Sequence, residues 1–399
     1  MLPRHPSSSA RHRHHPAGRS ATARGTVERV FLTRDWIHPA DDDVPAAPAA
    51  RGPATLPLFQ MPFPSSVGSR RPIAPVPPAT LRPTFSVMLP TFDPDLRFVR
   101  SLESVLAQAP DGDTMEIVVV DDASPRVDVT ALVRSIDPTG RVAVRRHPRR
   151  AGLAGNWNRA VDLARGHYIH LLHQDDYVLP GFYAAIERGF RAAPRAGMAF
   201  CRSRIVDGDD RLIKTSSRQR WFPGTLSGWL PRIAERQRVQ TPAAVVSRSA
   251  YERLGGFRDD LCHALDWEMW VRIAADYPVW YEPRALAVYR RHAANESQRL
   301  LSSGAVWPDL LQAIELNVLR LPPDAGRRVR ARSARWYACS ALRTAEKQLA
   351  RGDIDGAGRT LDHVPGMLRL LPASGDGSPA LRRVGKLRER LRTARRRAA

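Results

Sequence analysis

The chain has 399 residues, which is enough for one catalytic domain of ordinary size and additional segments, because a domain usually takes about 100–200 residues. It carries 62 Lys and Arg against 40 Asp and Glu, a formal net charge of +22 that favours ligands bearing phosphate, such as nucleotides, nucleic acid or anionic lipid. Much of this charge lies in the two tails, so it says little about the middle of the chain. No stretch approaches the roughly 18 apolar residues of a membrane-spanning helix, and the N-terminus lacks the apolar segment of a secretory signal.

The three cysteines, Cys201, Cys262 and Cys339, are far apart and form no CxxC pair. We therefore expect reduced, inert thiols of a cytoplasmic protein and neither a metal site nor a redox site built from cysteine.

Residues 1–83 are rich in Pro, Ala, Arg, Ser and His. Such a composition buries too little apolar surface to offset the entropy cost of ordering, so we expect a disordered tail, or in part a mis-set start codon. Residues 27–37 could form a small local element. The histidines His12, His14 and His15 are interpreted as part of a solvated basic tail.

From Phe85 onward, strand patterns alternate with helix patterns. The strands are predicted at 85–89, 116–120, 141–144, 167–172, 198–204, 241–247 and 285–289. The helices between them are predicted at 96–108, 129–136, 156–165, 181–193 and 249–254. This alternation predicts a three-layer α/β sandwich with a mostly parallel sheet. Residues 215–240 show no period and are either a mobile loop over a site or an irregular insertion.

Polar and acidic segments follow three of the predicted strands. They are Pro90-Thr91-Phe92-Asp93, Asp121-Asp122-Ala123-Ser124 and Gln174-Asp175-Asp176. Because ligands of open α/β sheets bind beyond the carboxyl ends of the strands, we expect these segments to meet at one crevice. Adjacent carboxylates resist joint ionisation, and a bound Mg²⁺ or Mn²⁺ would remove that cost, although a solvated Asp-Asp turn is the alternative. Neither GxGxxG nor GxxxxGK[ST] occurs, which excludes a dinucleotide fingerprint and a P-loop.

Six motifs in this order carry a family resemblance: SVMLPTFDPD, EIVVVDDAS, AGLAGNWNRAVDLARGHYIHLLHQDD, TPAAVVSRSAYERLGGF, ALDWEMWVRIA and YRRHAANES. Together they make residues 85–297 similar to the family 2 glycosyltransferases of GT-A fold. The resemblance implies a metal-dependent, inverting transfer of a sugar from a nucleotide-diphosphate donor to a saccharide or lipid-linked glycan acceptor. By analogy it also implies a role in cell-envelope polysaccharide synthesis.

The resemblance assigns donor-binding roles to four residues near the strand ends. Pro90 and Thr91 stand where the first strand meets the nucleoside, and Asp121 stands where a carboxylate accepts hydrogen bonds from the base. Asn158 is expected to line the nucleotide side of the crevice. Asp122, which follows Asp121, is expected to be structural.

The metal and ribose-diphosphate motif of the family matches Asp175 and Asp176. His173 occupies a place where the family often has a preceding carboxylate, so the order in which the two aspartates contact the metal stays open. His292 matches a position that helps hold metal or diphosphate in some relatives, and a structural role is its alternative. The implied metal is Mg²⁺ or Mn²⁺.

The catalytic base of the family matches Asp266, at the start of a predicted amphipathic helix. An inverting transfer needs a carboxylate that takes a proton from the acceptor hydroxyl as it attacks the anomeric carbon. Glu268 is the second candidate for this base, and a plain helix cap is the alternative role of Asp266.

Helices are also predicted at 305–319, 327–350 and 354–371, too few for a helical repeat array. The final segment, 381–397, sets Leu381, Val384, Leu387 and Leu391 opposite many arginines, as in a helix that lies on an anionic membrane. Binding of nucleic acid and plain solvation are the alternatives.

We therefore divide the chain into a disordered tail (1–83), a GT-A domain (84–299), a helical extension (300–372) and a basic tail (373–399). The expected location is the cytoplasm, with peripheral contact at the inner face of the plasma membrane. Two other functions compete with the transferase: an inactive scaffold of the same fold, and a nucleic-acid-binding protein that uses its basic tails. No specific nucleic-acid motif supports the latter.

Overall fold

The computed structural model of the chain describes residues 71–78, 80–110, 112–371 and 378–398. The predicted element at 27–37, the three N-terminal histidines and most of the predicted tail lie outside these residues.

A ten-stranded sheet has the strand order β3-β2-β1-β4-β9-β6-β10-β5, with β7 paired to β6 and β8 paired to β10. Six strands run parallel: β1 (Phe85–Thr91), β2 (Met115–Asp121), β3 (Ala143–Arg146), β4 (Tyr168–Leu171), β6 (Met198–Val206) and β10 (Val279–Arg290). The others are antiparallel to their neighbours: β5 (Tyr177–Val178), β7 (Leu212–Thr215), β8 (Gly224–Thr225) and β9 (Ala244–Ser247). The predicted mostly parallel sheet is confirmed.

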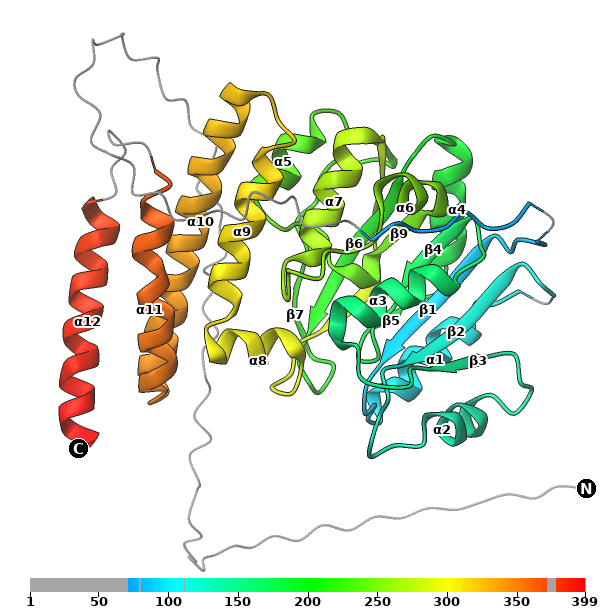
Figure 1. Cartoon of the computed structure of the whole chain (residues 1–399), viewed down its shortest axis with the longest axis horizontal. Coiled ribbons are helices and arrows are strands. Elements are labelled where there is room, and N and C mark those ends of the chain that lie inside the picture. Colours follow the sequence, from blue (N-terminus) through cyan, green and yellow to red (C-terminus); the bar gives the residue numbers. More distant parts are fainter. Residues whose placement is uncertain (1–70, 79, 111, 372–377, 399) are drawn as a thin grey trace, which may run out of the picture. The chain divides into compact units, whose positions relative to one another are not determined.

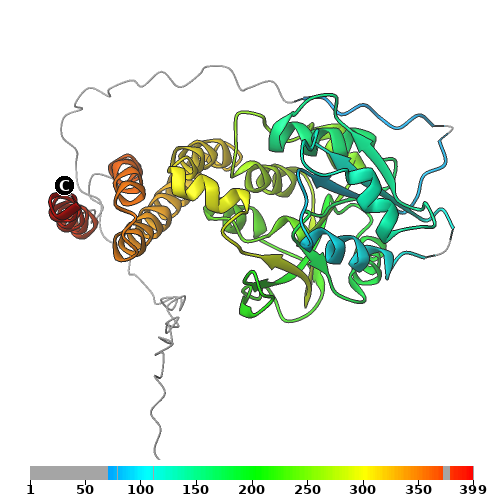
Figure 2. The same ribbon diagram turned by 90° about the horizontal axis from the view of Figure 1, so that it is seen from below.

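Helices cover both faces of the sheet, as Figures 1 and 2 show from two directions. One face carries α1 (Arg97–Leu106), α2 (Val129–Ile136) and α4 (Phe182–Ala192). The other carries α3 (Gly152–Leu163), α5 (Trp229–Glu235), α6 (Arg248–Leu254) and α7 (Leu265–Asp276). Strand β1 explains this sandwich: all seven of its residues are buried, and Met88 enters one core while Val87 and Leu89 enter the other.

The first described residues belong to the folded domain, although we expected them in the disordered tail. Ile73 is buried in the core beside α3, and the carbonyl oxygen of Ala74 accepts a hydrogen bond of 2.8 Å from Arg248. The backbone N–H of Gly256 donates to the carbonyl of Arg71 at 2.9 Å. The proline-rich composition hid these contacts because they are made largely by the backbone.

The region at 215–240, predicted as an irregular or mobile loop, is in large part packed structure. Strand β8 pairs with β10, and α5 buries Trp229 and Ile233 in the core. The indole N–H of Trp267 donates to the carbonyl oxygen of Ile233 at 2.6 Å, which ties α5 to α7. The helix escaped prediction because it has only seven residues and contains Pro231.

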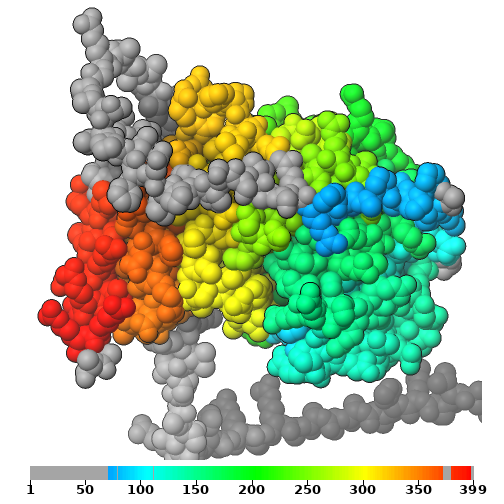
Figure 3. Space-filling view, in the orientation of Figure 1, coloured from blue at the N-terminus to red at the C-terminus, as the bar shows by residue number. Residues whose placement is uncertain are grey.

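Five helices follow the sheet: α8 (Glu296–Ser303), α9 (Val306–Val318), α10 (Pro323–Ala350), α11 (Ile354–Leu368) and α12 (Ser378–Ala398). α9 contacts α7, and α10 contacts α5, α9, α11 and α12. The space-filling view shows these helices following one another from yellow to red (Figure 3). Their buried side chains continue the core of the α7 face of the sheet.

The apolar stripe of the last helix is covered by protein. Val384, Leu387 and Leu391 of α12 are buried and join the same core as α10 and α11, whereas Leu381 is exposed. These three side chains therefore cannot face a membrane in this arrangement, and peripheral membrane contact of the segment stays a prediction. In the part of the chain that the structure describes, no helix is long and apolar enough to cross a membrane.

Candidate active site

The ends of β1, β2 and β4 meet at one edge of the sheet. The parallel register places Thr91 beside Asp121 and Met88 beside Leu171. The backbone N–H of Asp122 then donates to the carbonyl oxygen of Thr91 at 2.8 Å. Because adjacent parallel strands end on the same side, the predicted gathering of the three polar segments at one edge is confirmed.

The loop between β4 and β5 holds a compact group of possible metal ligands. His173, Asp175 and Asp176 each offer one ligand atom, and these atoms lie within 4.8 Å of one another. The Nδ1 of His173 lies 3.2 Å from Oδ2 of Asp176, close enough for attraction but without the alignment of a hydrogen bond. Trp157 of α3 stacks on the His173 ring, with centroids 5.0 Å apart, and so fixes the orientation of the ring.

The end of β10 fixes the aspartate pair from the other side. The backbone N–H of Arg290 donates to Oδ1 of Asp176 at 2.8 Å, and its Nε donates to the carbonyl oxygen of Asp175 at 3.0 Å. The Nε2 of His292 lies 2.9 Å from Oδ2 of Asp175. His292 is thus placed beside the acidic pair, 117 residues away from it in the sequence.

The two carboxylates titrate differently. Burial, together with the charge of Asp175, raises the pKa of Asp176 to about 6. Burial opposes ionisation of Asp175 as well, but the hydrogen bond from His292 and the charges of both histidines outweigh it and lower the pKa of Asp175. The pair therefore carries less than its full negative charge near pH 6 and would gain from a nearby cation.

A divalent cation fits this group of residues. The Oδ2 of Asp176, Nε2 of His173 and Nδ1 of His292 are buried and have no hydrogen-bond partner among the described residues. Carboxylate oxygens suit Mg²⁺ and Mn²⁺, and imidazole nitrogens are also common ligands of transition metals. The structure brings Asp175, Asp176 and His292 together, and binding of a metal by them stays a prediction.

Asp266 is the second residue of α7 and lies near the same group. Its Oδ1 accepts from the backbone N–H of Trp267 at 2.6 Å, and its Oδ2 accepts from the hydroxyl of Thr241 at 3.2 Å. Burial raises the pKa of Asp266 to about 6, against the lowering effect of these bonds and of the charge of His173. Ala264 and not Asp266 occupies the N-cap position, so a plain helix cap does not describe Asp266.

Glu268 is not available as a base. Both of its carboxylate oxygens pair with the guanidinium of Arg272, which is completely buried. Arg272 also donates to the carbonyl oxygens of Leu254 and Gly256, each at 2.9 Å. Glu268 therefore neutralises a buried cation that anchors the turn after α6, and we withdraw it as the second candidate.

Comparison with known proteins agrees with this geometry. Residues 86–255 match the family model described as Glycosyl transferase family 2. A protein of Mycobacterium tuberculosis, "Uncharacterized protein MT1568", is 30% identical over 267 residues, which cover 64% of this chain and 82% of that protein. The chain belongs to glycosyl transferase family 2.

Two further comparisons place the chain within a wider group. The succinoglycan biosynthesis protein ExoO of Rhizobium meliloti is 36% identical over 121 residues, which cover 30% of this chain and 33% of ExoO. The crystal structure of residues 1–349 of S. aureus TarS in complex with UDP-GlcNAc has a TM-score of 0.56 at 16% identity, and the match covers 78% of this chain and 87% of that one. At this identity the second comparison shows the fold alone, which is GT-A.

Within this GT-A fold, the residues expected to meet the nucleoside lie at the ends of β1 and β2. Pro90 and Thr91 are buried, and the Thr91 hydroxyl donates to the carbonyl oxygen of Leu89 at 3.1 Å. Asp121 accepts from the backbone and hydroxyl of Ser124 at 3.0 and 2.5 Å, and it also pairs with Arg146. The nucleobase of a donor could therefore hydrogen-bond to Asp121 only if Asp121 shared its contact with Arg146 or gave it up.

Asp122 has the structural role we expected. Its carboxylate accepts from the backbone N–H groups of Ala151 and Gly152, at 2.6 and 2.9 Å. It therefore holds the start of α3, the helix that carries Trp157.

The structure corrects the role that we predicted for Asn158. Its side-chain amide donates to the carbonyl oxygen of Phe257 at 2.9 Å and accepts from the backbone N–H of Phe257 at 2.7 Å. The side chain is buried and has its amide group fully engaged, so it secures the loop after α6 and does not line the nucleotide crevice.

Three residues of the site were not predicted: Arg290, Thr241 and Trp157. Arg290 and Thr241 lie inside motifs that carry the family resemblance, so their positions were marked, although their contacts were not. The stacking of Trp157 on His173 could not be predicted from the sequence. The pattern of a helix residue that faces the core is the same whichever side chain it packs against.

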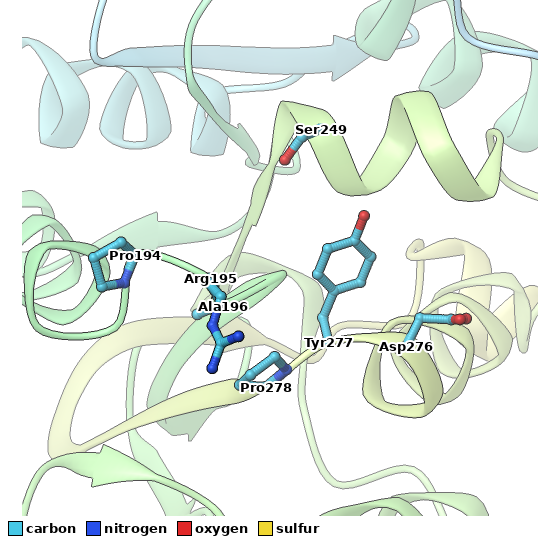
Figure 4. A pocket seen from close by; sticks show the side chains of 7 residues that line it. All are labelled: Pro194, Arg195, Ala196, Ser249, Asp276, Tyr277 and Pro278. Carbon is cyan, nitrogen blue, oxygen red and sulfur yellow. The ribbon is translucent and has the colours of Figure 1, made fainter.

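A surface pocket of about 420 Å³ lies elsewhere (Figure 4). It is lined by Pro194, Arg195, Ala196, Ser249, Asp276, Tyr277 and Pro278. These residues flank the amino ends of β6 and β10, whereas Arg290 and His292 follow the carboxyl end of β10. The pocket is therefore separate from the candidate active site.

Proposed function

We propose that this family 2 glycosyltransferase moves a sugar from a nucleotide-diphosphate donor to a saccharide or lipid-linked glycan acceptor, with inversion at the anomeric carbon. One observation carries the proposal. His173, Asp175 and Asp176 offer possible ligand atoms within 4.8 Å of one another at the ligand edge of the GT-A sheet. The charge of Asp266 helps to raise the pKa of His173, which supports its place in the same site.

Asp266 suits the role of the base. It is a carboxylate in the first turn of α7, it is held by Thr241, and burial raises its pKa to about 6. A general base is most effective when its pKa lies near the working pH. In the proposed reaction, Asp266 takes the proton of the acceptor hydroxyl while that oxygen bonds to the anomeric carbon and the nucleoside diphosphate leaves.

Asp175 and Asp176, with His292 beside them, would hold Mg²⁺ or Mn²⁺ at the diphosphate. When bound, the cation would offset the negative charge that develops on the leaving group. Pro90, Thr91 and the backbone around them would form the floor of the nucleoside site.

The biological setting follows by analogy. ExoO is described by its name as a succinoglycan biosynthesis protein, which supports a role of this chain in polysaccharide synthesis at the cell envelope. We place the enzyme in the cytoplasm with contact to the inner face of the plasma membrane. The outer face of α12 supports this contact, because Arg382, Lys386 and Arg390 are exposed there. We further propose a GT-A domain up to about residue 299 and a helical extension after it.

Release of nucleoside diphosphate from UDP-, dTDP- and GDP-sugars tests the proposal. In the presence of Mn²⁺, wild type should release the nucleoside diphosphate from one of these donor classes. The release should be slow with water as the acceptor and faster with a suitable glycan acceptor. Asp266→Asn should lose the acceptor-dependent rate, and NMR of the product should show an inverted anomeric centre. A folded protein that releases no diphosphate from any donor would favour the inactive scaffold.

A further inference from the structure

The loop that joins α5 to the short 3-10 helix before β9 (Thr241–Ala243) borders the candidate base. The hydroxyl of Thr241, the first residue after this loop, donates to Asp266 at 3.2 Å, and Nε2 of Gln237 in the loop is buried without a hydrogen-bond partner among the described residues. The backbone N–H of Gln237 in turn donates to the hydroxyl of Tyr337 in α10, at 3.2 Å. The loop is thus held between the base and the helical extension.

Three arginines lie in this loop or in α5, the helix that precedes it. Arg232, Arg236 and Arg238 lie within seven residues, and Glu235 is the acidic residue among them. Glu235 is already approached by Arg332 of α10, whose Nη1 lies 4.0 Å from its carboxylate. The guanidinium of Arg236 stacks on the ring of Trp336, 4.0 Å from its centroid. The positive charge of this group is therefore not balanced by neighbouring carboxylates.

Arg238 is half-buried, as are the other two arginines. Its Nε donates to the carbonyl oxygen of Arg232 at 2.7 Å, and its Nη groups donate no hydrogen bond to the residues that the structure describes. Burial, together with the charges of Arg236 and Arg232, lowers the pKa of Arg238 to about 10. The side chain nevertheless stays charged at neutral pH, so a partly buried guanidinium has no ion pair with a carboxylate of the described residues. Such a cation is costly unless an anion binds to it.

The position of Arg238 indicates whether the anion that it would bind belongs to the donor or to the acceptor. Arg238 follows Gln237, whose backbone N–H donates to Tyr337, and precedes Thr241, whose hydroxyl donates to Asp266, so Arg238 lies in the segment that borders the proposed base. In an inverting reaction, the diphosphate leaves on the face opposite to the attacking hydroxyl, and its proposed cation site is the group of Asp175 and Asp176. An anion beside Asp266 therefore belongs to the acceptor.

We propose that Arg238, assisted by Arg236, binds an anionic group of the acceptor, a phosphate or a carboxylate close to the hydroxyl that is glycosylated. This inference rests on the proposed function, because it takes Asp266 as the base. It adds the class of acceptor: a negatively charged glycan or a glycan carried on a phosphate.

A binding experiment tests the site without catalysis. Methyl phosphate is titrated into the full chain in EDTA and low salt, so that no cation at the aspartate pair draws it there. Wild type should bind methyl phosphate, and Arg238→Gln should weaken this binding by about tenfold or more, as expected for the loss of a charge-assisted contact. Arg238→Lys should retain part of the affinity. Arg390→Gln, on the exposed face of α12, is the matched control and should bind as wild type does. Equal affinity of wild type and Arg238→Gln would overturn the proposal.

Turnover gives the second test. Methyl glucoside, its 6-phosphate and methyl glucuronide serve as matched acceptors with the donor that wild type hydrolyses. Wild type should prefer the two anionic acceptors in kcat/KM, and Arg238→Gln should lose this preference mainly through KM. A preference that survives in Arg238→Gln, or a wild type that prefers the neutral acceptor, contradicts the inference. Absence of donor hydrolysis in all variants would instead count against the proposed function, and the binding experiment would still decide on the anion site.

Discussion

The carboxylate of Asp309, in α9, accepts a hydrogen bond of 2.6 Å from the backbone N–H of Ala264, the N-cap residue of α7. The same carboxylate accepts from the N–H groups of Cys262 and His263, at 2.6 and 3.0 Å. Three consecutive donors at a helix start would otherwise lack helical partners, so Asp309 caps α7 from a different helix. The helical extension thereby fixes the turn that leads to Asp266.

Asp309→Ala should lower the free energy of unfolding by about 2–4 kcal/mol, because several buried N–H groups lose a charged acceptor. It should also lower kcat more than it changes KM for the donor, because α7 carries the base. Asp309→Asn keeps an acceptor oxygen and should recover part of both losses. Urea denaturation and initial rates measure the two effects, and a stable Asp309→Ala variant with full kcat would refute this role.

Glu268→Gln should destabilise the protein by about 3 kcal/mol, since it leaves the buried guanidinium of Arg272 without its carboxylate partner. The matched control is Glu187→Gln, which breaks an exposed pair with Arg191 and should cost less than about 0.5 kcal/mol. Thermal or urea unfolding compares the two variants. A loss of activity in Glu268→Gln without a loss of stability would restore Glu268 as a catalytic candidate.

The rate of transfer should depend on the ionisation of Asp266. Its pKa of about 6 means that the base is protonated below that pH, so kcat at saturating donor should fall about tenfold per pH unit below pH 6. A pH–rate profile at fixed Mn²⁺ tests this expectation. A flat kcat between about pH 4.5 and about pH 7 would exclude Asp266 as the base.

Stability gives a separate check on the same residue. Because the pKa of Asp266 is raised from 3.8 to about 6 in the folded state, its ionised form disfavours the native state, and this cost builds up as the pH rises from 3.8 to about 6 and is complete above it. Asp266→Asn should therefore be more stable than wild type by about 3 kcal/mol near pH 8 and show no such gain near pH 4. Unfolding curves at the two pH values measure the difference, and an equal effect at both would contradict the raised pKa.

His170 should make the protein sensitive to acid. Burial lowers the pKa of His170 to about 3, and its ring is bonded to the hydroxyl of Tyr183 and to the carbonyl oxygen of Pro242, both at 3.1 Å. Below the ordinary pKa of 6.5, His170 is protonated in the unfolded chain but stays neutral in the native state. The free energy of unfolding therefore falls from about pH 6.5 towards pH 3, by up to about 1.4 kcal/mol per pH unit. His170→Gln should remove this slope from the pH dependence of unfolding, and an unchanged slope would argue against it.

The parallel sheet and the position of its ligand edge could be predicted from the sequence, because alternating apolar strands and helices leave few topologies. Strand pieces of two residues, such as β5 and β8, have no period to detect. The seven-residue helix α5 was missed for a similar reason.

The site was predictable in its charged residues and not in their partners. Asp175, Asp176 and Asp266 stand at the ends of elements that the sequence marks. Asn158 was misread because its partner, Phe257, is 99 residues away, and such pairings arise only from tertiary packing. The same holds for the contact between α9 and the start of α7.

The central claim is that the edge around Asp175 and Asp176 binds a nucleotide sugar together with a divalent cation. Thermal unfolding with UDP-, dTDP- and GDP-sugars, in Mn²⁺ or in EDTA, tests it most directly, since a ligand that binds only the native state raises the melting temperature. We predict that one class of donor stabilises wild type only in Mn²⁺, that Asp176→Asn loses this effect and that Asp266→Asn keeps it. Stabilisation of equal size in EDTA, or in Asp176→Asn, would contradict the account.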